Sequence, residues 1–274
     1  MKLLLFGSNG MLGRYMKMYL QDIYEVVALT RKDLDLSRST PEEIMSFLSK
    51  NVCKGDIILN ASGLIKQRKT KAIEMIKVNS LFPQILANLK ANIECEVIHI
   101  TTDCVFNGTR GSYRETDAHD CYDIYGKSKS LGENIINTNI RTSIIGEEIT
   151  NKLSLLEWVR SMHGGTIEGY QNHIWNGVTC LELAKLIDRV IKGKNFWKGT
   201  RHIFSPVDIS KFSLIESIIK IYGLNIRLKK INSQEKCFRN LSSNSAPLIQ
   251  KDIYRQLVEM REFNLKEREE NDSK

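Results

Sequence analysis

Met1-Lys2-Leu3-Leu4-Leu5-Phe6-Gly7-Ser8-Asn9-Gly10-Met11-Leu12-Gly13 opens the chain and decides the fold. The apolar run Lys2–Phe6 predicts a buried strand, and the pattern of Met11–Leu20 predicts a helix directly after it. The glycines between them permit a tight turn and a close approach of the backbone to a pyrophosphate. The helix N-terminus then presents free N–H groups to the phosphates. A glycine triplet alone is weak evidence, but its place after the first strand predicts a dinucleotide site that includes Gly7, Gly10 and Gly13.

The alternation of strands and helices continues through the first half of the chain. Further strands are predicted at Glu25–Leu29, Asp56–Asn60, Val97–Thr101 and Ile140–Ile145, and further helices at Thr40–Lys50, Ile73–Lys90 and Ile124–Asn137. Pro83 should kink or break the second of these helices. Stacked strand–helix–strand units predict one parallel sheet with helices on both faces. The expected fold class is therefore α/β, a Rossmann-like doubly wound parallel sheet.

The strict alternation fades after Gly146. Residues 1–146 are predicted to form the nucleotide-binding domain, with parts of 170–205 completing its sheet. Residues 147–274 should form mainly a smaller C-terminal α/β lobe that binds the substrate. Its predicted elements are the helices Leu153–Met162, Thr179–Lys192 and Lys211–Tyr222 and a short strand at Asn225–Lys229. The charged tail, residues 266–274, is expected to fray.

The composition is that of an ordinary globular protein, with 274 residues, 42% hydrophobic content and a net charge of +8. The first apolar run is too short for a signal peptide or a membrane span, so we expect a cytoplasmic protein. The six cysteines form no C-x-x-C pair, which predicts reduced thiols and no metal site. The basic cluster at residues 66–71 favours a solvated segment. The chain carries no recognisable motif for binding nucleic acid.

The end of the second predicted strand should decide the type of nicotinamide cofactor. The chain reads Leu29-Thr30-Arg31-Lys32 there, with no acid at the strand end to bind a ribose 2′-hydroxyl. Arg31 is well placed for a 2′-phosphate, so NADPH is preferred over NADH, which stays possible. Arg31 can instead be an ordinary surface residue. Asp35 and Leu36 either flank the adenine or belong to a turn before the next helix.

The predicted catalytic residues lie on a helix and at the end of a strand. Tyr125-Gly126-Lys127-Ser128-Lys129 has a Y-x-x-x-K spacing, which places Tyr125 and Lys129 on one helix face. The lysine ammonium should lower the phenol pKa, and the tyrosine can protonate a ketone oxygen as hydride arrives. Thr102 follows an apolar strand and can hydrogen-bond the same carbonyl. An exposed helix pair and a β-branched strand end are the alternatives for each feature alone.

In these blocks the chain resembles the extended short-chain dehydrogenase/reductases, most closely the dTDP-4-dehydrorhamnose reductase branch. The blocks are Gly7–Gly13, Asn60–Gly63, Val78-Asn79 with Pro83, Thr101–Gly108, Tyr113 with Glu115 and Asp117, Tyr125–Lys129 with Gly132-Glu133, Ile140–Ser143 and, more weakly, Asn176–Thr179. The resemblance implies that Tyr125 is the acid, Lys129 its partner and Thr102 the hydroxyl that positions the keto oxygen. It places Asp103 at the substrate.

The resemblance also implies the rest of the site. Gly10, Met11 and Leu12 would meet the pyrophosphate, and Gly63, Leu64 and Ile65 would line the cofactor. The implied substrate is a nucleoside-diphosphate 6-deoxy sugar with a 4-keto group, reduced for surface polysaccharide synthesis. A homodimer is possible in this family.

Departures from the family pattern leave alternatives open. Some members bind magnesium through glutamates, but Arg14-Tyr15-Met16 brings no acid into the first helix, so no metal is expected. An epimerase or epimerase-reductase on the same fold would need a further acid or base, for which Cys104, Cys121 and His119 are candidates. A non-catalytic role, like that of the regulatory subunit of methionine adenosyltransferase, is disfavoured by the intact Thr102, Tyr125 and Lys129.

Overall fold

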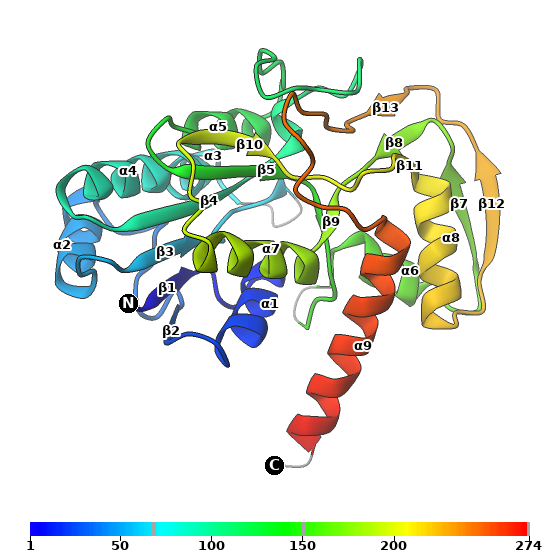
Figure 1. Cartoon of the computed structure of the whole chain (residues 1–274). Coiled ribbons are helices and arrows are strands. Elements are labelled where there is room, and N and C mark those ends of the chain that lie inside the picture. The colour runs from blue at the N-terminus through cyan, green and yellow to red at the C-terminus, as the bar shows by residue number, and fades with distance from the viewer. Residues whose placement is uncertain (67–69, 150–151, 273–274) are drawn as a thin grey trace.

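The computed structural model describes residues 1–66, 70–149 and 152–272 (Figure 1). The predicted cluster residues Arg68 and Lys69 and the last two residues of the predicted tail lie outside this part. One parallel sheet organises the first half, with the strand order β10-β5-β4-β3-β1-β2. Its strands are β1 (Leu3–Phe6), β2 (Val26–Leu29), β3 (Ile57–Asn60), β4 (Glu96–Thr102), β5 (Thr138–Thr142) and β10 (Gly199–His202). Strand β10 comes from the second half of the chain and pairs with β5.

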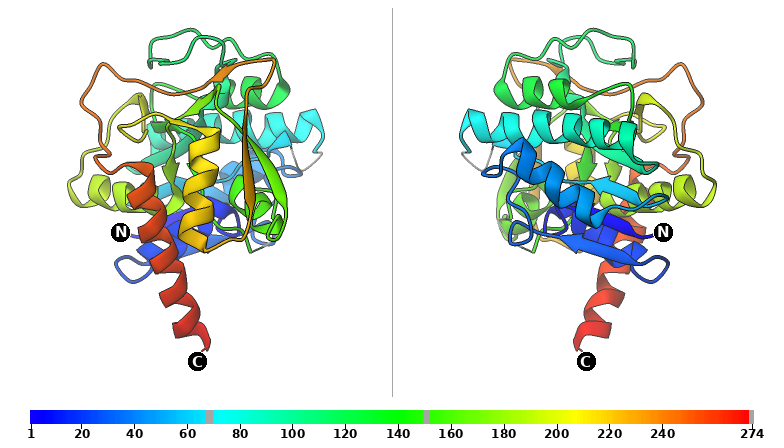
Figure 2. Two further views of the ribbon diagram at one scale, coloured as in Figure 1. Left: turned by 90° about the vertical axis from the view of Figure 1, so that its right-hand side faces the viewer. Right: turned by 90° about the vertical axis from the view of Figure 1, so that its left-hand side faces the viewer.

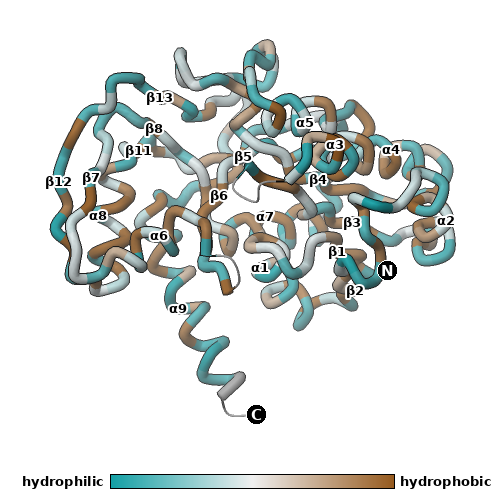
Figure 3. The backbone as a smooth tube through the Cα atoms, turned by 180° about the vertical axis from the view of Figure 1, so that it is seen from behind, coloured by the Kyte–Doolittle hydropathy of each residue, from teal (hydrophilic) through white to brown (hydrophobic). Residues whose placement is uncertain are grey.

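Alternate residues of the strands feed two separate cores, which is why helices cover both faces. Leu3, Leu5 and Ile98 point into one core, which α1 (Met11–Leu20) and α7 (Cys180–Lys192) complete. Leu4 and Ile58 point into the other core. That second core is covered by α2 (Pro41–Asn51), α3 (Ala72–Ile76) and α4 (Phe82–Asn92). Figure 3 shows hydrophobic segments gathered along the central strands and the helices packed on them. The predicted doubly wound α/β fold is confirmed.

The later residues form a smaller lobe beside the sheet. Its helices are α6 (Leu155–Ser161) and α8 (Lys211–Tyr222). Its strands pair as β11 (Ile209–Ser210), β8 (His173–Trp175) and β13 (Cys237–Phe238), as β12 (Arg227–Ile231) with β7 (Thr166–Tyr170), and as β6 (Ile144–Ile145) with β9 (Val178–Thr179). No helix in the described ranges combines the length and the apolar character that crossing a bilayer requires.

Two predicted helices differ in detail, for local reasons. Pro83 follows a π-helical turn at Lys77–Leu81 that joins α3 to α4, so the predicted helix is irregular at this point but not broken, and the missing N–H falls in the first turn of α4. Helix α5 (Ile124–Gly132) ends five residues earlier than the predicted Asn137. Asn134 turns the chain there, because its Oδ1 accepts hydrogen bonds from the backbone N–H of Ile136 (3.1 Å) and Asn137 (2.9 Å).

The described part of the charged tail, residues 266–272, is helical where fraying is predicted. It forms the last turns of α9 (Ile253–Asp272), and this helix extends beyond the body of the molecule in both views of Figure 2. Asn264 donates to the Tyr15 hydroxyl at 2.7 Å, and Arg268 pairs with the buried Glu147 at 2.6 Å. These two contacts with residues far away in the sequence hold the helix, and local composition does not reveal them.

Candidate active site

The glycine turn between β1 and α1 is as tight as its sequence predicts. Gly7 has a φ of +77°, and a Cβ there would lie 2.7 Å from the Ser62 nitrogen. A Cβ on Gly13 would lie 2.1 Å from the Gly7 carbonyl oxygen. Gly10 is the N-cap of α1, and no side chain caps this helix. The N–H groups of its first turn therefore stay available to an anion.

A cavity of about 530 Å³ adjoins this turn at the carboxyl ends of β1, β2 and β3. Of the predicted cofactor residues it is lined by Gly7, Gly10, Arg31, Asp35, Leu36, Gly63 and Leu64. Met11, Leu12, Gly13 and Ile65 do not line it. Leu12 is buried in the core, so only its backbone could face a phosphate. The cavity follows the glycine turn, as the adenosine half of a dinucleotide requires.

The loop after β2 contains an acid that folds back onto the strand end. The Oδ2 of Asp33 accepts hydrogen bonds from the backbone N–H and the hydroxyl of Thr30, both at 2.7 Å. These bonds hold the pKa of Asp33 below its usual value. Asp35 is similarly engaged, because its Oδ1 accepts from Ser37. Arg31 and Lys32 are both exposed and line the cavity, so this loop offers it two basic side chains.

Strand β4 and helix α5 bring Thr102, Tyr125 and Lys129 together. Thr102 ends β4, where its hydroxyl accepts from the Cys104 N–H (3.2 Å) and lies 3.1 Å from the Asp103 carboxylate. Tyr125 lies close enough to the Thr102 hydroxyl for that group to act on the phenol pKa. Lys129 stands one turn further along α5, and its buried ammonium donates to the Ile100 carbonyl at 3.1 Å. The predicted catalytic groups therefore share one place at the carboxyl end of β4.

Burial controls the charge state of this cluster. It raises the pKa of the Tyr125 phenol, and the Thr102 hydroxyl only partly offsets this effect. Burial also lowers the pKa of Lys129 to about 8, against the opposing influence of Glu133. The phenol pKa is therefore raised where the spacing of Tyr125 and Lys129 suggests a lowered one, and the Lys129 ammonium is bonded to the Ile100 carbonyl. Tyr125 is thus a neutral phenol with a proton to give.

Asp103 lies beneath the same site and is almost completely buried. Burial raises the pKa of its carboxyl group, while the nearby Arg239 guanidinium opposes the rise. Arg239 comes from the segment after β13 and reaches Cys104 Sγ at 3.8 Å. The C-terminal lobe therefore contributes a cation directly beside the cluster of predicted catalytic groups.

Asn79 belongs to a block that carries the family resemblance, but no role in the site was predicted for it. Its Oδ1 accepts from the Leu64 N–H at 2.9 Å, and its Nδ2 donates to the Leu64 carbonyl at 2.9 Å. The same Nδ2 donates to the Ser128 hydroxyl at 3.0 Å. Asn79 thus ties the cofactor-cavity loop to the helix that carries Tyr125 and Lys129.

Comparison with known proteins gives one matching family, described as the RmlD substrate binding domain, over residues 1–146. A dTDP-4-dehydrorhamnose reductase of Aggregatibacter actinomycetemcomitans is 28% identical over 232 residues, 79% of this chain and 78% of that protein. The spore coat polysaccharide biosynthesis protein SpsK of Bacillus subtilis is 32% identical over 151 residues, 53% of this chain and 51% of that protein.

Solved structures show the same fold at low sequence identity. A dTDP-4-dehydrorhamnose reductase from Clostridium acetobutylicum superposes with a TM-score of 0.80 at 20% identity, covering 97% of this chain and all of that one. One from Bacillus anthracis, in complex with NADP, has a TM-score of 0.79 at 18% identity, covering 95% of this chain and 98% of that one. The architecture is therefore shared along nearly the whole chain.

Proposed function

The chain belongs to the RmlD substrate binding domain family, and from this premise we propose that it is an NADPH-dependent reductase of a nucleoside-diphosphate 6-deoxy-4-keto sugar. The observation that carries the proposal is the meeting of Thr102, Tyr125 and Lys129 beside a cavity that begins at the glycine turn. The resemblance to extended short-chain dehydrogenase/reductases that the sequence indicates is confirmed by the family match. A role in surface polysaccharide synthesis follows from the same relatives.

The residues present fit a nicotinamide dinucleotide. The uncapped start of α1 offers the backbone N–H groups around Gly10 to the pyrophosphate, and the cavity between Arg31 and Leu64 takes the adenosine. A Cβ on Gly63 would lie 3.2 Å from the Lys129 ammonium, so this glycine leaves the lysine free to reach a ribose. The bound cofactor supplies hydride to the keto carbon.

The chain itself supplies the proton and fixes the ketone. Tyr125 is neutral because it is buried, so it donates its phenolic proton to the keto oxygen. The Thr102 hydroxyl holds that oxygen within reach of the phenol. The protonated Lys129, one helical turn away, stabilises the tyrosinate that remains. Asp103 and Arg239 form the floor of the sugar site.

Arg31→Ala should lower kcat/KM for NADPH at least about tenfold and leave kcat/KM for NADH nearly unchanged. The exposed guanidinium on the cavity wall is the group offered to the 2′-phosphate, which NADH lacks. Steady-state kinetics with both cofactors test this expectation. Lys54→Ala, which removes an exposed positive charge that does not line this cavity, is the matched control. Equal losses of kcat/KM with both cofactors would show that Arg31 does not bind the 2′-phosphate.

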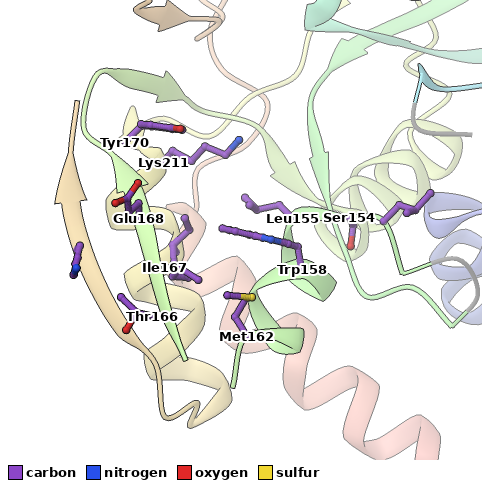
Figure 4. A pocket seen from close by; sticks show the side chains of 12 residues that line it. Ser154, Leu155, Trp158, Met162, Thr166, Ile167, Glu168, Tyr170 and Lys211 are labelled. Atoms are coloured by element: carbon purple, nitrogen blue, oxygen red, sulfur yellow. The ribbon is translucent and has the colours of Figure 1, made fainter. Parts of the chain in front are cut away.

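A second cavity, of about 720 Å³, lies in the C-terminal lobe between α6, β7 and α8 (Figure 4). Trp158 projects from α6 toward Ile167 of β7, and its side chain is 41% exposed. Lys211 and Lys229 add two positive charges to the wall, and Glu168 adds one negative charge. A planar aromatic surface next to two cations suits a nucleobase and its diphosphate, so we assign the nucleotide half of the substrate to this cavity.

Trp158→Leu should abolish most of the tryptophan fluorescence quenching by dTDP and weaken dTDP binding about tenfold. A stacked base quenches an indole directly, and stacking is worth about 1–3 kcal/mol per base. Titration of dTDP into the wild type and the variant measures both effects. Lys50→Met, on α2 at the far end of the sheet, is a control that should leave the titration unchanged. Undiminished quenching in Trp158→Leu would show that the base does not bind against Trp158.

The alternatives find less support in the geometry. An epimerase needs a second acid or base, but burial raises the pKa of Cys104 to about 12 and also raises that of Cys121. His119 Nε2 lies 2.6 Å from an Arg141 N–H donor, which occupies its lone pair. No grouping of three metal-binding side chains occurs in the part of the chain that the structure describes. The homodimer expected from the family remains a prediction.

A further inference from the structure

A row of polar side chains crosses three strands behind the catalytic lysine. The strand register places Thr101 of β4, Arg141 of β5 and His202 of β10 side by side. Arg141 is 2% exposed and is among the largest fully buried side chains of the protein. The mechanism proposed above uses none of these three residues. A buried arginine is costly without partners, so its contacts indicate what it holds in place.

Arg141 grips the carboxylate of Glu133, the residue that caps the C-terminus of α5. Its Nε donates to Oε1 at 2.9 Å and its Nη2 donates to Oε2, a two-point contact that fixes the plane of the carboxylate. The hydroxyls of Thr101 and Thr200 donate to the same carboxylate at 2.9 and 3.1 Å. Burial alone would raise the pKa of Glu133, but these bonds hold it below its ordinary value. Glu133 is therefore a fixed, ionised carboxylate inside the protein.

Two histidines complete the shell around Arg141. Its remaining N–H groups point at the Nε2 atoms of His202 (2.7 Å) and His119 (2.6 Å), which must act as acceptors. His202 then donates from Nδ1 to the Ser242 carbonyl, and His119 donates from Nδ1 to the hydroxyl of Ser130, next to Lys129. Burial and the Arg141 charge lower the pKa of both histidines, so both are neutral. The shell adds no competing charge and directs the arginine onto Glu133.

We propose that Glu133, locked by Arg141, is a positioning residue that keeps the Lys129 ammonium charged beside Tyr125. Lys129 and Glu133 are four residues apart, so they lie on one side of the end of α5. The effect of this inference on catalysis rests on the proposed reductase function, whereas the charge state of Lys129 does not. It gives the buried Glu133–Arg141 pair an electrostatic role in addition to packing.

The surroundings of Lys129 leave Glu133 as the charge that favours its protonated form, among the residues described. From β4, His99 faces the lysine and is kept neutral by burial, and Ile100 offers a carbonyl. From α5, Tyr125 is a neutral phenol. Burial lowers the pKa of Lys129, and Glu133 is the group that raises it. Glu133→Gln removes this favourable charge and leaves the Arg141 cation without its partner, and both changes disfavour the protonated lysine.

The test is a direct titration of Lys129 by NMR, read from its 13Cε shift in the protein without cofactor. The pKa should fall from about 8 in the wild type to about 7 or below in Glu133→Gln. Glu96→Gln is the matched control, because Glu96 stands at the opposite end of β4 and pairs with Lys90. An unchanged Lys129 pKa in folded Glu133→Gln overturns the proposal.

Glu133→Gln leaves Arg141 without its ion partner and can fail to fold. The double variant Glu133→Gln/Arg141→Met removes both charges, and it should still lower the Lys129 pKa, but by less than the single variant because a neighbouring positive charge is removed as well. A Lys129 pKa at the wild-type value in the folded double variant would equally overturn the proposal. If the wild type reduces no keto sugar, the reductase function fails, while the titration still decides the role of Glu133.

Discussion

Tyr125→Phe should reduce kcat for keto-sugar reduction by about 10²- to 10⁴-fold, the usual contribution of a positioned general acid. The variant keeps the ring in its buried place beside Thr102 and removes only the proton that the ketone oxygen must receive. Cofactor affinity should change little, because the phenol hydroxyl is not part of the cavity that adjoins the glycine turn. The rate is measured as NADPH oxidation with a dTDP-4-keto-6-deoxy sugar.

Tyr122→Phe is the matched control for this variant. Tyr122 lies three residues earlier with its side chain 82% exposed, so the same substitution there should leave kcat unchanged. NADPH binding, followed by fluorescence, separates a chemical defect from a binding defect. A Tyr125→Phe enzyme that turns over at the wild-type rate would contradict the assignment of the proton donor.

The elements of the main sheet were predictable because each is encoded locally. The strand Leu3–Phe6, the glycine turn and α1 follow one another within twenty residues. Each strand is apolar at successive positions, and alternate side chains point into the core on one face of the sheet or the other. The helix spacing of Tyr125 and Lys129 also needs no long-range information. These features predict the fold class, which is confirmed, and the candidate catalytic residues, whose role stays a prediction.

The rest of the site depends on contacts between distant segments. Asn79 meets Leu64 and Ser128 only after a π-helical turn has placed it, and Arg141 meets His119 and His202 only when β5 lies beside β10. The sequence also does not reveal the charge states of the buried side chains. The spacing of Tyr125 and Lys129 suggests a lowered phenol pKa, whereas the depth of burial, set by the whole fold, reverses the direction.

Lys129→Met should lower kcat by about 10²-fold or more without lowering the unfolding temperature. The activity falls because the tyrosinate formed after proton transfer loses its neighbouring cation. Stability should not fall, because a lysine whose pKa drops from 10.5 to about 8 on folding carries a charge that burial penalises. The penalty at neutral pH is on the order of 3 kcal/mol, and methionine removes it while filling the same space. Loss of the bond to Ile100 offsets part of this gain.

The pH dependence provides a second, independent readout for Lys129. The unfolded chain binds more protons than the folded one between about pH 8 and the ordinary lysine pKa, so wild-type stability should rise with pH across this window. Activity should move the opposite way, because kcat/KM for NADPH falls above about pH 8 as the ammonium is lost. Lys129→Met should remove both trends, whereas Lys127→Met, on the exposed side of α5, should keep both. If Lys129→Met lowered both the activity and the unfolding temperature, the role of Lys129 would be in packing. Loss of a catalytic charge alone should lower the activity without lowering the unfolding temperature.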